Sequence, residues 1–130
     1  MVKKQNMNGI LVKRTNYKLM DGCVFCKIIK GEVKKTFEYE DDDCVVFKSN
    51  APVAEHHLLI VPKKHIENFM HLDEVITSMT KAAHKMVEKF KLGDGYKMVF
   101  NGGKYQVVMH VHWHLLAGNL EKNSDILNKL

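Results

Sequence analysis

Three histidines alternate with apolar residues over 110–114, the run His-Val-His-Trp-His near the C-terminal end of this chain. A short apolar run comes directly before them, and this alternating, β-branched pattern predicts a strand over 107–115. Because strand side chains alternate between two faces, we expect His110, His112 and His114 on one face, with neighbouring rings about 7 Å apart. One metal ion or one phosphate cannot contact all three rings equally, so the pattern predicts a division of labour.

Cys23 and Cys26 have the two-residue spacing of a zinc knuckle. A thioredoxin-like redox pair would need a strand directly before the first cysteine, and the sequence predicts none there. A zinc site would need two further ligands, which histidine would have to supply because the chain has no second cysteine pair. His65, in a turn after a predicted strand, and His110, at one end of the row, are the most natural candidates. This assignment leaves the other two histidines of the row free.

His112, in the middle of the row, is suited to nucleophilic catalysis. A neutral imidazole whose other nitrogen is hydrogen-bonded can attack phosphorus and form a phosphohistidine intermediate, which water then hydrolyses. His114 and His57 can bind the phosphate oxygens, and backbone amides of the glycine turn at 101–103 can contribute to the same anion site. The alternative is a catalytic zinc held directly by His110 and His112, because alternate strand residues can share a metal. The spacing leaves both possibilities open.

Hydrophobic periodicity predicts an α+β fold with five strands and one long helix. The predicted strands are residues 36–40, 44–47, 57–62, 96–100 and 107–115. From Leu72 the apolar residues recur at helical spacing, which predicts an amphipathic helix of about five turns that ends at Gly93. A short N-terminal helix is expected at 27–30, stopped by Gly31, and a frayed helical turn at 123–130. We expect a mainly antiparallel sheet with the long helix against one face.

The composition, 45% hydrophobic and 27% charged over 130 residues, predicts a soluble globular protein. No apolar run approaches the roughly 18–20 residues of a membrane span. Three cysteines without a secretion signal predict a reducing compartment, and we expect a cytoplasmic protein. The net charge of +5 lies in residues 1–19, which carry five bases and no acid, so the balanced remainder predicts no nucleic-acid partner. We expect a basic, mobile extension over 1–20 and one domain over 21–130.

From about Asp21 to Gly118, roughly three quarters of its length, the chain resembles the histidine triad (HIT) family. Four segments carry the resemblance: Cys23-Val-Phe-Cys26-Lys-Ile-Ile-Lys-Gly-Glu, His57-Leu-Leu-Ile-Val-Pro-Lys-Lys-His65-Ile, Gly95-Tyr-Lys-Met-Val-Phe-Asn101 and His110-Val-His-Trp-His114-Leu-Leu. The run Leu-Leu-Ala-Gly at 115–118 is most similar to the branch of nucleoside phosphoramidate hydrolases, often called Hint.

This resemblance implies a homodimer whose sheets join and whose long helices pair. It implies binding of a purine nucleotide or nucleotidyl conjugate, cleaved at the α-phosphorus through a covalent nucleotidyl-histidine on His112. His57, His114 and Asn101 match phosphate-contacting positions. The resemblance also implies structural zinc and no organic cofactor. The implied zinc ligands are Cys23, Cys26, His65 and His110.

The sequence departs from the family pattern at three places. An acid that usually holds the ribose hydroxyls is replaced by Ser49, whose hydroxyl lacks the bidentate, charge-assisted capacity of a carboxylate. A serine that usually assists the leaving group is replaced by Val107, which cannot donate a hydrogen bond. The loop before it is shortened to Gly102–Tyr105. The expected function is that of a HIT-type phosphoramidase or nucleotidyl transferase. The alternatives are a nucleotide-binding or interaction module with weak catalysis, and a dinucleoside polyphosphate hydrolase.

Overall fold

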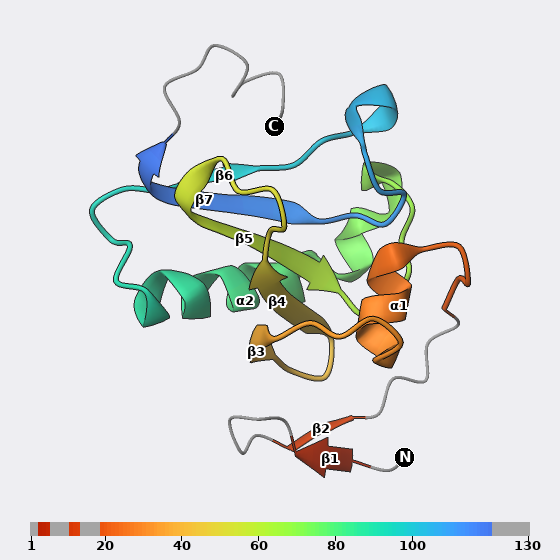
Figure 1. The fold of residues 1–130 in the computed structure, drawn as a ribbon. Helices are drawn as coiled ribbons and strands as arrows, with labels where there is room; N and C mark the ends of the chain where they lie inside the picture. The colour runs from red at the N-terminus through yellow and green to blue at the C-terminus, as the bar shows by residue number, and fades with distance from the viewer. Residues whose placement is uncertain (1–2, 6–10, 14–18, 121–130) are drawn as a thin grey trace.

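The computed structural model describes residues 3–5, 11–13 and 19–120. Within 19–120 the chain forms one five-stranded antiparallel sheet with helices on both faces, the α+β fold that was predicted (Figure 1). The spatial order of the strands is β3-β4-β5-β7-β6. Their bounds are Phe37–Glu40 for β3, Cys44–Lys48 for β4, Ala54–Pro62 for β5, Lys97–Val99 for β6 and Trp113–Leu120 for β7. The helices are α1 (Val24–Lys30), α2 (Ile76–Lys89) and two 3₁₀ helices, η1 (Phe69–Glu74) and η2 (Gly103–Tyr105).

The central strands of the sheet are buried on both faces because a different helix covers each face. Along β4 the side chains of Val46 and Val45 point in opposite directions and enter two separate apolar clusters. The first cluster packs α2 against the sheet and includes Met79. The second packs α1 against the other face and includes Phe25 and Ile29. The histidine at position 114 pairs with Leu59, a member of the second cluster, so it lies on the face that carries α1.

The sequence predicted a strand that begins at residue 107. In the structure this strand, β7, begins only at Trp113. Trp113 pairs with Ile60, so the same register would next place Val111 opposite Pro62. Proline has no N–H to donate to a ladder, and pairing ends there. The Val111 N–H instead donates to the Ile66 carbonyl at 2.7 Å, in the loop after β5. The predicted alternation persists outside the strand, because Val111 and Leu115 both enter the cluster beneath α2.

The predicted long helix is divided in two. Asn68 caps η1 by accepting the Met70 N–H, and Val75, with φ −127° and ψ 1°, separates η1 from α2. Leu72 and Val75 are three residues apart, a spacing that suits a 3₁₀ turn as well as an α-helix. The apolar pattern therefore predicted the buried face correctly and the helix type over 72–75 wrongly.

The predicted N-terminal extension contains two short strands, β1 (Lys3–Gln5) and β2 (Leu11–Lys13), which pair antiparallel. Its mobility remains a prediction, and the turn predicted at 123–130 lies outside the described residues. Across the part of the chain that the structure describes, no helix has the length and apolar character to cross a membrane.

A buried ion pair joins the ends of two strands and leads to a first prediction. The Lys63 ammonium, 1% exposed, lies 2.8 Å from a carboxylate oxygen of Glu40, 7% exposed. Removing one partner of a buried pair leaves the other charge uncompensated, so Lys63→Met should lower the free energy of unfolding by about 3–5 kcal/mol in denaturant titrations. The pair between the exposed Lys48 and Glu38 supplies the control, because Lys48→Met should cost less than about 1 kcal/mol. Equal effects of the two substitutions would contradict the prediction.

Candidate functional site

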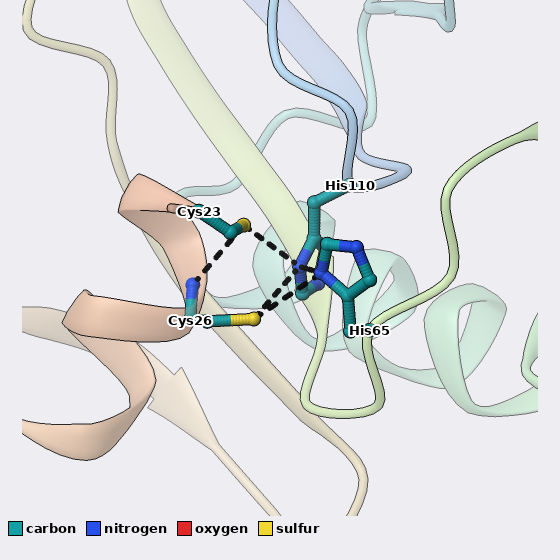
Figure 2. A group of neighbouring side chains, drawn as sticks. All are labelled: Cys23, Cys26, His65 and His110. Atoms are coloured by element: carbon teal, nitrogen blue, oxygen red, sulfur yellow. Dashed lines mark hydrogen bonds between the residues drawn. The ribbon is translucent and has the colours of Figure 1, made fainter. Parts of the chain in front are cut away.

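Four residues that the sequence analysis singled out as metal ligands meet at one point beside α1. Cys23 and Cys26 come from the start of α1, His65 from the loop after β5, and His110 from the segment before β7 (Figure 2). Their side chains point toward a common centre, and all four donor atoms lie within 4.8 Å of one another. Cys23 also caps α1, since its sulfur accepts the Cys26 N–H at 3.4 Å.

Four of the six separations between these donor atoms are close to those of a tetrahedral metal site. A zinc ion with Zn–S near 2.3 Å and Zn–N near 2.0–2.1 Å requires donor–donor edges of about 3.3–3.8 Å. The His110 Nδ1 lies 3.4 Å from Cys23 Sγ, 3.6 Å from Cys26 Sγ and 3.2 Å from His65 Nδ1. The Cys26 Sγ lies 3.2 Å from His65 Nδ1. The four residues therefore form a cluster that could bind a metal.

The ring of His110 is oriented for this role by its second nitrogen. Its Nε2 lies 2.7 Å from the Pro62 carbonyl oxygen, which can only accept, so Nε2 carries the hydrogen and Nδ1 presents a lone pair to the cluster. Burial lowers the pKa of His110 to about 4, which keeps the ring neutral. Burial raises the pKa of Cys26 to about 11, so binding of a cation would release a proton from this thiol.

A second group of imidazoles lies on the same face of the sheet. His57, on β5, and His114, on β7, are joined by a 2.9 Å contact between His57 Nε2 and His114 Nδ1. The His57 Nδ1 accepts the Val53 N–H at 3.1 Å, so the His57 hydrogen is on Nε2 and is donated to His114. His114 must then carry its own hydrogen on Nε2, where it is available to a ligand.

His112 lies beside this pair and is oriented by the backbone. Its Nδ1 lies 2.8 Å from the His110 carbonyl oxygen, so Nδ1 carries the hydrogen and Nε2 has a free lone pair. The rings of His112 and His114 have centroids 5.1 Å apart. Burial lowers the pKa of His57 and His112, and burial with the neighbouring rings lowers that of His114 to about 4. The three imidazoles are therefore neutral near pH 7 and buried enough to interact strongly with an anion.

The remaining predicted site residues flank this group. Ser49 follows β4 directly and its N–H donates to the His57 carbonyl at 2.9 Å, while its hydroxyl oxygen accepts the Ala51 N–H at 3.2 Å. Asn101 lies two residues past Val99, which pairs with His114, so an extension of this register would bring Asn101 level with His112. The Val107 side chain is 86% exposed and is directed to solvent.

Phe25 is a buried residue that the sequence analysis did not select. Its ring lies edge-on to His112, with centroids 5.0 Å apart at 85°, and to His110, 5.8 Å apart at 77°. The only sequence signal was its place between Cys23 and Cys26, and an aromatic residue there also suits an ordinary core position. The backbone partners of the histidines could not be found from residue types at all.

Comparison with known proteins agrees with this geometry. Residues 30–120 match the HIT domain family. The chain belongs to the histidine triad family. It is 37% identical to a HIT family hydrolase from Clostridium thermocellum, with a TM-score of 0.74 over 82% of this chain and 98% of that structure. It is 36% identical over 104 residues to an adenosine 5′-monophosphoramidase of Candida albicans, covering 72% of this chain and 68% of the relative.

A solved histidine triad protein from Mycobacterium smegmatis is described as zinc-bound. It is 26% identical to this chain, with a TM-score of 0.66 over 81% of this chain and 78% of that structure. The relatives of this chain therefore include a hydrolase, an adenosine 5′-monophosphoramidase and a zinc-bound protein.

The cluster predicts the composition of the metal site. Protein purified with zinc and dialysed should retain about one zinc ion per chain by atomic emission, and Cys26→Ser should lose most of it because a thiolate ligand is replaced by a weak neutral donor. His84→Ala, at an exposed position on α2, is the matched control and should retain the metal. Retention by His112→Ala would exclude that residue as a ligand, whereas metal loss on its substitution would favour the catalytic-zinc alternative.

Proposed function

We propose that this protein is a nucleoside phosphoramidase, a hydrolase that cleaves the bond between an amine and the α-phosphorus of a nucleotide through a nucleotidyl-histidine. The orientation of His112 supports this proposal most directly, because its free Nε2 lone pair is what a nucleophile at phosphorus requires. The named phosphoramidase among the relatives supports the substrate class.

In the first step the His112 Nε2 attacks phosphorus, a P–N(histidine) bond forms and the P–N bond to the amine breaks. The His110 carbonyl holds the Nδ1 hydrogen and stabilises the positive charge that develops on the ring. The His114 Nε2–H, which His57 positions, donates a hydrogen bond to the departing nitrogen, and this nitrogen takes a proton from solvent as the P–N bond breaks. Water then attacks phosphorus, the bond between phosphorus and His112 breaks, and the proton lost by this water passes to solvent as the nucleoside monophosphate is released.

The substrate's phosphate oxygens would be bound by neutral donors. We assign this role to His114 and the Asn101 amide, and assign the ribose hydroxyls to Ser49. His57 donates its only N–H to His114 and therefore supports the anion through that ring. Hydrogen-bond donors in a partly buried site stabilise an anion without the repulsion that a carboxylate would add. A purine nucleotide or nucleotidyl conjugate is therefore the proposed ligand.

We assign zinc to the cluster of Cys23, Cys26, His65 and His110. Two thiolates and two imidazoles match the preferences of this metal, and four protein donors are typical of a closed, structural site. The zinc would connect α1 to the loop after β5 and to the segment before β7. It would take no part in the reaction. The three free, buried thiols suit a reducing compartment, and we propose a cytoplasmic location.

We further propose a homodimer whose sheets join at β6. This strand is at one edge of the sheet, and it presents Met98, 37% exposed, and the following Phe100, 47% exposed. An edge strand with exposed apolar side chains is suited to pairing with a second copy.

A nucleotide-binding module with weak catalysis is the second candidate. The exposed Val107 and the hydroxyl of Ser49, already engaged in a turn, favour it, because neither assists the leaving group or binds ribose with a charge. Calorimetry with nucleoside monophosphates, alongside turnover of an adenylyl-amine, separates the candidates. Tight binding without turnover would support the module.

Substitution of the proposed nucleophile gives the central test. His112→Ala should lower the rate of adenylyl-amine hydrolysis by about a thousandfold or more, because no other group can form the covalent intermediate. The intact protein mixed briefly with substrate should show the added mass of a nucleotidyl group, and the variant should not. His84→Ala should retain parental activity. Near-parental turnover by His112→Ala would remove this residue as nucleophile.

The acid limb of the pH profile should report the lowered histidine pKa values. Neutral His112 is the reactive form, so kcat/KM is fully developed above the folded-state pKa and is lost as pH falls through it. Because burial lowers that pKa below the ordinary value of about 6.5, the midpoint of the acid limb of kcat/KM should lie below about pH 6.5. A midpoint above pH 7 would contradict a buried, neutral nucleophile.

A further inference from the structure

Phe25 connects the two groups of histidines, and we propose that it is a positioning residue that couples the metal cluster to the orientation of His112. The inference rests on the proposed function for the meaning of that orientation. Phe25 is 6% exposed and lies in α1 between the two cysteines of the cluster. It does not contact the reacting atoms in the proposed mechanism; it acts through the ring of His112.

The ring of His112 needs two restraints to hold its Nε2 in one direction. The torsion that rotates a histidine ring is broad and nearly two-fold, so one hydrogen bond at Nδ1 leaves room for rocking of the plane. The Phe25 ring, edge-on at 85° with centroids 5.0 Å apart, supplies the second restraint. Phe25 in turn contacts Phe47, whose ring centroid is 5.6 Å away at 69°.

Both restraints lead back to the metal cluster. The acceptor of the His112 hydrogen bond is the backbone carbonyl of His110, whose side chain is one of the four clustered donors. Phe25 is positioned by α1, and the two cysteine donors of the cluster precede and follow Phe25 in the sequence. A metal that binds the four donors therefore fixes the hydrogen-bond acceptor and the packing ring at once.

Ile28 provides the matched comparison. It lies on the same helix, is also 6% exposed and packs in the same apolar cluster. The aromatic contacts of α1 with His110 and His112 are made by Phe25. Ile28→Ala and Phe25→Leu remove similar amounts of buried carbon, so loss of stability alone would affect both variants alike.

The test is a cycle of Phe25→Leu and metal removal in the full-length protein, read by long-range ¹H–¹⁵N spectra of the histidine rings. The His112 signals are assigned with His112→Gln. In the zinc-loaded parent His112 should show one tautomer, with hydrogen on Nδ1. Phe25→Leu should retain zinc, show a mixture of tautomers and lose tenfold to a hundredfold in kcat with little change in KM. Ile28→Ala should retain the single tautomer and the parental kcat.

Metal removal from the parent should give mixed His112 signals, and metal removal from Phe25→Leu should have a smaller effect than it has on the parent, because the packing restraint is already lost in this variant. A single Nδ1–H tautomer in zinc-loaded Phe25→Leu would overturn the proposal. Independent effects of Phe25→Leu and of metal removal, which multiply when the two changes are combined, would also overturn it. If the metal-free protein unfolds, the His112 tautomers of zinc-loaded Phe25→Leu and Ile28→Ala are compared, and this comparison tests the proposal. The ring spectra need no turnover, so failure of the proposed activity is distinguished from failure of the coupling.

Discussion

Pro62 imposes the constraint on which both groups of histidines depend. Its missing N–H ends the ladder between β5 and β7, and its carbonyl becomes the acceptor for the ring of His110 instead of a ladder partner. Val111 bonds to the loop after β5, so the chain leaves the sheet there. His110 therefore reaches α1, while His112 and His114 stay beside His57. One proline thus divides a run of three similar residues between two environments.

The orientation of these rings relies on backbone groups. The partners of His110, His112 and His57 include the carbonyls of residues 62 and 110 and the N–H of Val53. A carboxylate partner would raise the basicity of an imidazole, whereas a carbonyl fixes the tautomer with less effect on its charge. Together with burial, this keeps the rings neutral. A weakly basic imidazole also departs readily from phosphorus, which favours the second step of the proposed reaction.

Much of this arrangement could be predicted from the sequence because it depends on periodicity. The alternation at 110–115 placed Val111 and Leu115 in the core, and the spacing of Cys23 and Cys26 indicated a knuckle. The start of β7 could not be predicted, because it depends on which strand residue faces Pro62. The tautomers of the histidines and the contacts of Phe25 could not be predicted either, because they depend on distances between segments far apart in the chain. Ser49 and Asn101 were expected at the site from the family resemblance, and their roles remain proposals.

The sulfur of Cys23 is both the cap of α1 and a member of the donor cluster, which links helix formation to the supply of metal. A helix of seven residues is too short to persist by its own propensity, so its lifetime depends on what holds its ends. By mass action, a metal held by the four donors would stabilise this helix to a degree set by the free metal concentration. In a metal-starved cell the segment around α1 would then open more often and be more easily cut by proteases.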